Sequence, residues 1–404
     1  MRKYFVKKIL ILAILFIITC MLTGCWNRIE LNTLGITLAL AIDKENDDTI
    51  VTAEVIRPQR GENGNGGTGK NTPVKYIQGT GKTVYEALNN ITYKFDRKIF
   101  LAHDKVIILS EDIAKSTMSD ILDFTQREHE FRETTYFLVS KQGKAEDILG
   151  TLGGIESIPS ISIEEIMKNQ KTNGKAVSIQ GFQYYRTLLT EGIQPVLGVI
   201  QVLPKHKFRT SDEDKEEYEA NTDGAAVMKD NKFVGYLNGT QTFGYNCITN
   251  HVSNGVITSQ IPNKEGKFTV EILSSRCDNS VILQDGKYNI FINFYLKGMI
   301  QDTTGYINAN NPVEIEKLEK ANSEDLKKII EEDIGITQKE YKTDIFGFGK
   351  LVHQKYPKEW KRTKMDWDKL FAEAIVTVKV KTEISKTGFI TIDADTIKES
   401  RNNE

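Results

Sequence analysis

The sequence is poor in the residues and motifs on which many enzymes and metal proteins depend. It has five histidines in 404 residues, and none of them forms the His-Glu-x-x-His pattern of a zinc-binding helix. It lacks the Gly-x-Ser-x-Gly sequence in which α/β-hydrolases carry their nucleophile. We therefore predict a protein that is not an enzyme, with no metal and no cofactor.

The sequence also lacks a dominant charge and a second long apolar run. It has 53 basic and 55 acidic residues, a balance that argues against a nucleic-acid partner. The one long uncharged apolar run extends from Ile9 to Leu22. Since a membrane-spanning helix needs about 20 apolar residues, we expect no segment after Cys25 to cross a bilayer.

The N-terminus has the pattern of a secretory signal. Four basic residues and no acidic residue stand in the first eight positions: Arg2, Lys3, Lys7 and Lys8. The apolar run ends at Leu22-Thr23-Gly24-Cys25, which resembles the bacterial lipobox. We predict cleavage between Gly24 and Cys25 and attachment of a diacylglyceryl group to the Cys25 thiol, because two or more acyl chains form a stable anchor. An ordinary secretory signal with a chance cysteine, or a short anchor helix, remains as an alternative.

Cleavage at this position would leave residues 25–404 as the mature chain. With the four basic residues of the signal removed, 49 basic and 55 acidic residues remain, a net charge of −6. Cys20 would leave with the signal, and Cys247 and Cys277 would remain. An exported protein can form a disulfide, but we favour two buried reduced thiols.

Two glycine-rich stretches imitate a phosphate-binding loop. The first, Gly64 to Lys70, has the glycines and the lysine, but Asn71 replaces the required Ser or Thr and Pro73 prevents a following helix. The second, Gly79 to Thr83, lacks the first glycine of the motif. A helix N-cap at Thr80 or Thr83 explains the second stretch without a nucleotide.

Hydrophobic periodicity predicts a mixed α/β (α+β) fold. Alternating or continuous apolar residues predict strands at 36–42, 51–55, 74–78, 106–109, 134–140, 196–203, 225–229, 233–237, 256–261, 268–274, 288–300 and 373–384. Helical spacing predicts helices at 84–95, 112–130, 145–149, 163–169, 183–190 and 313–334. The charged stretch 205–223 is predicted to be a loop. We expect a signal peptide (1–24), an N-terminal α/β domain (25–195), a strand-rich middle domain (196–310) and a C-terminal α/β domain (311–404).

Several sequence blocks resemble the C-subunit lipoproteins of bacterial spore germinant receptors, the Ger(x)C family. The first block is Gly24 to Ile36, directly around the lipobox. Similar blocks follow at 80–83 with 86–88, at 103–111, at 127–128 with 131–132, and at 224–227 with Leu237. The most distinctive block is Asp344-Ile345-Phe346-Gly347-Phe348-Gly349, followed by Pro357, Trp360 and Trp367.

This resemblance implies a lipid-anchored, three-domain protein with mixed sheets and helices and with no known catalytic activity. It implies two integral-membrane partner subunits, of A and B type, and a place on the outer face of the spore inner membrane. There the protein would be needed for germination triggered by nutrients. The alternative is a solute-binding lipoprotein of a transporter, which would hold its ligand between two similar lobes.

The aromatic residues of the last block permit two interpretations. Phe346, Phe348, Trp360 and Trp367 could form the packed core of the last domain. They could also form a partner-facing patch, because Trp and Phe are enriched in the cores of interfaces. Exposure of the rings distinguishes the two.

Overall fold

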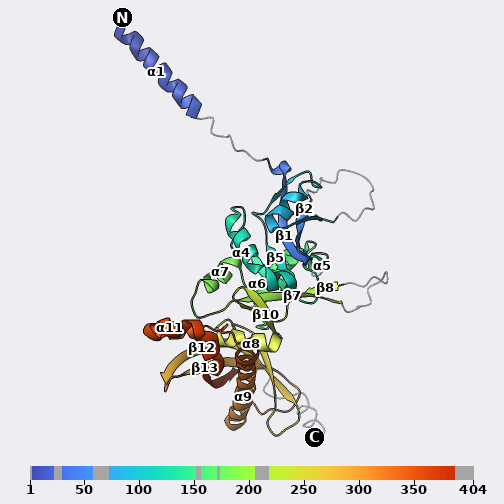
Figure 1. Cartoon of the computed structure of the whole chain (residues 1–404). Helices are drawn as coiled ribbons and strands as arrows, with labels where there is room; N and C mark the ends of the chain where they lie inside the picture. Colours follow the sequence, from blue (N-terminus) through green and yellow to red (C-terminus); the bar gives the residue numbers. More distant parts are fainter. Residues whose placement is uncertain are drawn as a thin grey trace, which may run out of the picture.

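The computed structural model describes residues 2–21, 30–57, 72–151, 156–170, 173–204 and 218–386. From residue 30 onward, these residues are built around two β-sheets with helices packed against them (Figure 1). The resulting architecture confirms the mixed α/β class predicted from the sequence.

The larger sheet has ten strands, in the order β10-β9-β7-β6-β5-β1-β2-β3, with β4 beside β1 and β8 beside β7. Its strands are β1 (Leu34–Glu45), β2 (Asp48–Ile56), β3 (Val74–Gly81), β4 (Lys98–Phe100), β5 (Val106–Leu109), β6 (Tyr136–Ser140), β7 (Val196–Pro204), β8 (Tyr218–Asn221), β9 (Ala225–Lys229) and β10 (Lys232–Leu237). Strands β1, β5, β6 and β7 run parallel to one another, and the hairpins at both edges are antiparallel.

Helices cover both faces of this sheet. One hydrophobic core includes buried residues of α2 (Val84–Ile91), α3 (Glu111–Ser116), α4 (Met118–Arg127) and α7 (Gly181–Leu188). A separate core on alternate strand positions includes α5 (Ala145–Leu149) and α6 (Pro159–Asn169). With both faces covered, the central strands are apolar at consecutive positions, and β5 and β6 are buried throughout.

The smaller sheet has four strands, in the order β11-β12-β13-β14. They are β11 (Val256–Gln260), β12 (Lys267–Gln284), β13 (Lys287–Thr303) and β14 (Ile375–Lys386). Buried residues alternate with more exposed ones along β13, so one face of this sheet is packed. The helices of this part are α8 (Gly239–Ile248), α9 (Pro312–Ile336), α10 (Phe348–Lys355), α11 (Pro357–Thr363) and α12 (Trp367–Glu373). Shorter turns lie at Leu31–Thr33, Thr337–Tyr341 and Lys364–Asp366.

The two sheets share a hydrophobic core. Val196 of β7 and Ala225 and Val227 of β9 belong to the same buried cluster as the inner face of the smaller sheet. The predicted domain boundary after residue 195 falls between β6 and β7, and these two strands pair with each other. The predicted boundary after residue 310 falls between β13 and β14, which also pair with each other. The division into three domains at these two positions therefore stays a prediction, and strand pairing connects the segments on either side of each position.

Several element boundaries differ from the sequence-based expectation. The helix predicted at 112–130 is two helices, with a break at Thr117, where φ is −130°. Part of the stretch predicted as a loop at 205–223 is strand β8, while 205–217 lies outside the described residues. Helix α8 was not predicted, because nearly all of its residues are buried and it has no polar face that would reveal its period.

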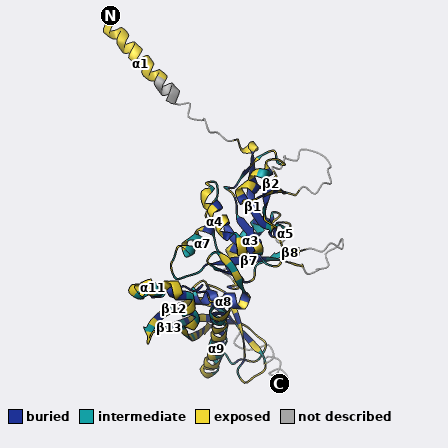
Figure 2. Cartoon of the chain, viewed as in Figure 1, coloured by how far each residue is buried: buried dark blue, intermediate teal, exposed yellow. Residues whose placement is uncertain are grey.

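The N-terminal segment forms a helix, α1 (Arg2–Met21), whose described side chains are exposed (Figure 2). No described helix of the chain combines the length and the apolar character needed to cross a membrane.

Candidate functional site at the junction of the two sheets

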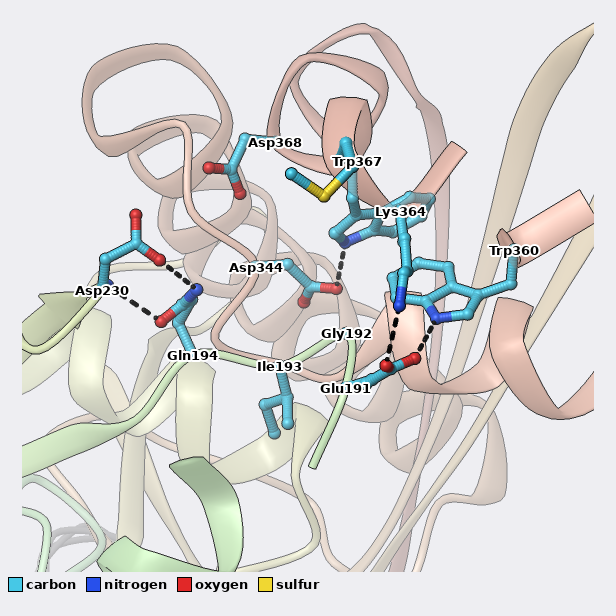
Figure 3. Close-up of a pocket in the computed structure, with 11 residues that line it drawn as sticks. Glu191, Gly192, Ile193, Gln194, Asp230, Asp344, Trp360, Lys364, Trp367 and Asp368 are labelled. Atoms are coloured by element: carbon cyan, nitrogen blue, oxygen red, sulfur yellow. Dashed lines mark hydrogen bonds and ion pairs between the residues drawn. The ribbon is translucent and has the colours of Figure 1, made fainter. Parts of the chain in front are cut away.

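The molecule has two halves, one built on the larger sheet and one on the smaller sheet. The segment that joins α7 to β7 crosses the N-terminal end of α10 and connects these two halves (Figure 3). The backbone N–H of Lys350 donates to the carbonyl oxygen of Gly192 over 3.0 Å. The backbone N–H of Gln194 donates to the carbonyl oxygen of Asp344 over 2.8 Å. Two backbone hydrogen bonds therefore hold the larger sheet's connecting segment against the C-terminal block.

The close approach depends on glycine at both positions. Gly192 has φ of +81°, and a Cβ atom there would lie 2.3 Å from the carbonyl carbon of Gly349. A Cβ atom on Gly349 would lie 2.6 Å from Nε1 of Trp367. Only glycine combines the left-handed backbone of position 192 with this lack of a side chain.

Asp344 is the buried acceptor around which the C-terminal block is organised. Its Oδ1 accepts the backbone N–H groups of Phe346 (3.0 Å) and Gly347 (2.9 Å). Its Oδ2 accepts the backbone N–H of Gly349 (2.7 Å) and the indole N–H of Trp367 (3.0 Å). Burial raises the pKa of Asp344 to about 6, and the donated hydrogen bonds limit that rise.

Glu191 forms the outer polar contact of the junction. Its carboxylate accepts the indole N–H of Trp360 over 2.7 Å and pairs with Lys364 over 3.1 Å. The hydrogen bond from Trp360, followed by that from Lys364, lowers the pKa of Glu191. His353 stacks on the Trp360 ring, with 5.7 Å between the ring centroids.

A pocket of about 380 Å³ lies between these groups (Figure 3). Its carboxylates come from both halves of the molecule: Glu191, Asp230, Asp344 and Asp368. Each of these carboxylates has a polar partner. Besides the contacts of Glu191 and Asp344, Gln194 Nε2 donates to Asp230 over 3.3 Å, and Lys229 pairs with Asp368 over 2.7 Å. Hydrogen bonds and ion pairs between these side chains join the two halves, so the chemical role of the pocket residues is to fix the relative position of the halves.

Comparison with known proteins identifies the family. The profile of the family described as "Spore germination protein N-terminal domain" matches residues 27–202. The profile described as "Spore germination B3/ GerAC like, C-terminal" matches residues 223–388. The chain belongs to the GerAC-like family of spore germination proteins. It is accordingly a subunit of a spore germinant receptor, as the resemblance to the Ger(x)C family implied.

Individual relatives cover nearly the whole length of this GerAC-like protein. "Spore germination protein KC" of Bacillus subtilis is 27% identical over 394 residues, covering 95% of this chain and 97% of the relative. "Spore germination protein B3" of the same organism is 24% identical and covers 89% and 93%. The crystal structure of the GerBC protein superposes with a TM-score of 0.55 at 22% identity, over 86% of this chain and 96% of that chain, and shows the same fold.

The structure corrects the hypothesis of a partner-facing aromatic patch. Phe346, Phe348, Trp360 and Trp367 are only 8%, 0%, 3% and 5% exposed. Phe346 packs on Phe348, and Trp360 packs edge-on against Trp367. The four rings form the core of the GerAC-like C-terminal block, and in this structure they offer no open surface to a partner.

Gly24 and Cys25, the predicted cleavage and lipidation site, lie outside the described residues. Cys247 and Cys277 are both buried free thiols, and burial raises the pKa of each. Thr83 caps helix α2, and its Oγ1 accepts the backbone N–H of Glu86 over 3.1 Å, as predicted for the second glycine-rich stretch.

One group of described residues has side-chain atoms close enough to share a metal ion: Glu128, His129 and Glu130. Lys98 already pairs with Glu130 over 2.8 Å, and the Glu128 carboxylate contacts His129 over 3.3 Å. Their loop is partly exposed, and such groups occur commonly without an ion. We assign no metal to it.

Sequence reasoning missed Glu191, Gly192 and the role of Asp344. Asp344 lies in the most distinctive sequence block, in which the prediction of a site concerned only the aromatic residues. An aspartate just before Phe-Gly-Phe-Gly is a usable signal, because Asp side chains accept backbone N–H groups two or more residues ahead. Gly192 offers no such signal, since its contact lies far along the chain.

Proposed function

We propose that this protein is the lipid-anchored, non-catalytic C subunit of a nutrient receptor of the spore. Acylated Cys25 would hold it on the outer face of the spore inner membrane. There it would assemble with two integral-membrane subunits, of A and B type, and stabilise or gate them from outside.

The observation that carries the proposal is the match of both halves of the chain to spore germination families, at residues 27–202 and 223–388. The junction at Gly192 and Gly349 supports it, because a shared core and direct backbone hydrogen bonds join the two halves. Because the junction holds the two halves together, a displacement caused by a contact at one end of the subunit would move the other end as part of one body.

The alternative, a solute-binding lipoprotein of a transporter, finds less support. Proteins of that class have two similar lobes on either side of a ligand cleft. Here one half is a ten-stranded sheet and the other a four-stranded sheet, and the two share hydrophobic core.

Deletion of the gene tests the proposal. We expect spores without the protein to lose the germination response to at least one nutrient, and an intact copy to restore it. A photoreactive residue placed at Asn32 should capture membrane subunits, because this position lies close to the lipidated cysteine. The same residue placed at Lys361 on α11, beyond the larger sheet at the junction, is the matched control. An unchanged response to every nutrient tested, with no subunit captured from Asn32, would contradict the receptor role.

A further inference from the structure

The end of the larger sheet where the chain enters carries a group of basic and apolar side chains. Strand β1 begins there at Leu34, which pairs with Lys98 of β4. Strand β2 ends and β3 begins at the same end, where Ile56 pairs with Val74. Figure 1 shows β1 and β2 in the upper part of the folded body.

The ring of Phe95 ties the loop after α2 to this end. A Cβ atom on Gly35 would lie 2.5 Å from the Phe95 ring. The Nζ atom of Lys75 lies 5.6 Å from the centroid of the same ring. The loop residues Tyr93 and Lys94 therefore lie on the same end as the first residues of β1 and β3. We call this group the entry surface: Leu31, Arg57, Lys75, Tyr93, Lys94 and Arg97.

The apolar members of the entry surface are open to solvent. Leu31 is 73% exposed and Tyr93 is 82% exposed. Isolated exposed apolar side chains are common on proteins. Here, however, a leucine and a tyrosine stand among basic residues, and tyrosine is enriched where proteins meet the headgroup region of a bilayer.

The basic members of the entry surface lack acidic partners. Neighbouring Lys98 pairs with Glu130 over 2.8 Å. Within the described part of the chain, Arg57, Lys75, Lys94 and Arg97 form no ion pair. The acidic side chains nearby are Glu30 and Asp96, both exposed, and Glu128 and Glu130, which act on Lys98. With Lys98 included, five basic side chains stand against four acidic ones, so this end carries a small positive excess on a protein whose mature chain is net negative. Its four basic side chains without ion pairs complement an anionic surface.

The tether brings this end to the bilayer, provided that Cys25 is acylated as proposed above. Leu31 is the sixth residue after Cys25, and a fully extended chain of six residue steps reaches about 20 Å. The first turn of the folded body therefore stays within about 20 Å of the anchoring lipid.

We propose that the entry surface docks on the headgroups of an anionic bilayer. Lys75, Lys94, Arg57 and Arg97 contact lipid phosphates, and Tyr93 and Leu31 lie at the level of the headgroups. Each basic side chain near an anionic surface strengthens association by about fivefold. The acyl chains retain the protein, and the entry surface sets its orientation, with the smaller sheet directed away from the membrane.

Vesicle binding without the acyl chains tests this proposal. The suitable protein is residues 25–404 with Cys25→Ala, which cannot be acylated. It keeps both sheets, because no residue before Leu34 belongs to the hydrophobic clusters. We expect it to sediment with vesicles of equal parts phosphatidylglycerol and phosphatidylcholine at low ionic strength. Phosphatidylcholine alone should not bind it, and salt should release it from the anionic vesicles because charge contacts are screened.

Variants of the same protein locate the contact. Lys75→Gln with Lys94→Gln should weaken binding to anionic vesicles by about 25-fold, since two basic contacts are lost. Tyr93→Ser should weaken it further. The matched control is Lys358→Gln with Lys361→Gln, which removes the same charge from α11 and should leave binding unchanged. Unfolding curves establish that each variant is folded.

Two results would overturn the lipid contact. One is the absence of binding to anionic vesicles by the folded protein, and the other is an equal loss in the control. Loss of crosslinking to membrane subunits in the entry-surface variants, without any vesicle binding, would assign the surface to a protein instead and would likewise overturn it. Vesicle binding by these variants does not bear on the receptor role, because acylation of Cys25 and the germination response of spores without the protein are measured separately.

Discussion

Gly192 and Gly349 meet backbone to backbone at the junction of the two halves. The carbonyl oxygen of Gly192 accepts the N–H of Lys350, the residue directly after Gly349, over 3.0 Å. Because neither residue carries a side chain, the connecting segment lies directly on the first turn of α10. The relative position of the two sheets thus depends on glycine, which has no Cβ atom, at both positions.

Gly192→Ala should destabilise the protein by about 2 kcal/mol or more, because alanine is strained at positive φ and its Cβ would also overlap the Gly349 backbone. The matched control is Gly286→Ala in the β12–β13 turn. Gly286 has a similar φ of +74°, but nothing lies within 4 Å of its Cβ position. The control isolates backbone strain, for which we expect about 1 kcal/mol. Denaturant unfolding of both variants measures the difference, and equal losses would show that the close contact contributes nothing.

Asp344→Asn should destabilise the protein by about 2–4 kcal/mol, because the new amide group would face N–H donors that now bind Oδ2. The effect depends on pH. The folded pKa of about 6 lies above the unfolded value near 3.8, so the protonation linked to Asp344 stabilises the fold below pH 4. That contribution is lost as pH rises from about 4 to 6.

The loss caused by Asp344→Asn should therefore be largest at acid pH and level off above pH 6. Urea unfolding of wild type and variant from pH 4 to pH 7 checks this. Asp230→Asn, at an exposed carboxylate that lines the same pocket, should show no comparable trend. A difference that stays flat across this range would mean that the carboxyl group of Asp344 keeps its unfolded pKa.

Asp333→Asn should stabilise the protein. Asp333 lies on α9 against Gly244 of α8, it is fully buried, and neither of its carboxylate oxygens has a hydrogen-bond partner. Burial, followed by the charge of Glu332, raises the pKa of Asp333 well above its usual value of 3.8. The groups facing it, Tyr245 and Cys247, offer no positive charge.

Because the folded pKa of Asp333 is raised, its stabilising contribution is complete below pH 3.8 and declines as pH rises. At pH 7 the neutral asparagine should gain about 1–3 kcal/mol over wild type. The gain should shrink toward pH 4. Thermal unfolding at both pH values measures it, and a variant less stable than wild type at pH 7 would show that the carboxyl group has a partner in solution.

Local patterns predicted the elements whose residues alternate or repeat clearly. Strand β5 has the bounds expected from its apolar run, and the β9–β10 hairpin turns at Asp230 and Asn231, both with positive φ. Helix α8 escaped prediction because it is buried on all sides. The short helices α10 to α12 gave no complete period from which they could be recognised.

The candidate site could be predicted only in part. The sequence block from Asp344 to Gly349 was identified, but whether its rings pack inward or outward depends on what covers them. Their cover includes Glu191 and Gly192 from the other half of the chain, and no periodicity links residues so far apart. The pairing of β13 with β14 escaped for the same reason, because parallel strands need a long connection.

Cys25→Ala should abolish lipidation, because only the cysteine sulfur can form the thioether to the diacylglyceryl group. The matched control is Cys20→Ala, five residues earlier in the same segment, which should be acylated like wild type because residue 20 would be removed with the signal. Incorporation of labelled fatty acid measures acylation directly. Partition with membranes, in cells that lack the partner subunits, measures retention.

The membranes must be washed at high salt before retention is scored. Basic residues such as Lys75 and Lys94 would hold even the unacylated protein weakly on anionic lipids at low salt, and screening removes that contribution. Two or more acyl chains resist such a wash, since their burial does not depend on charge. A Cys25→Ala protein that stays with the membrane after washing would contradict the anchor, and the membrane contact would then have to come from the uncleaved N-terminal segment.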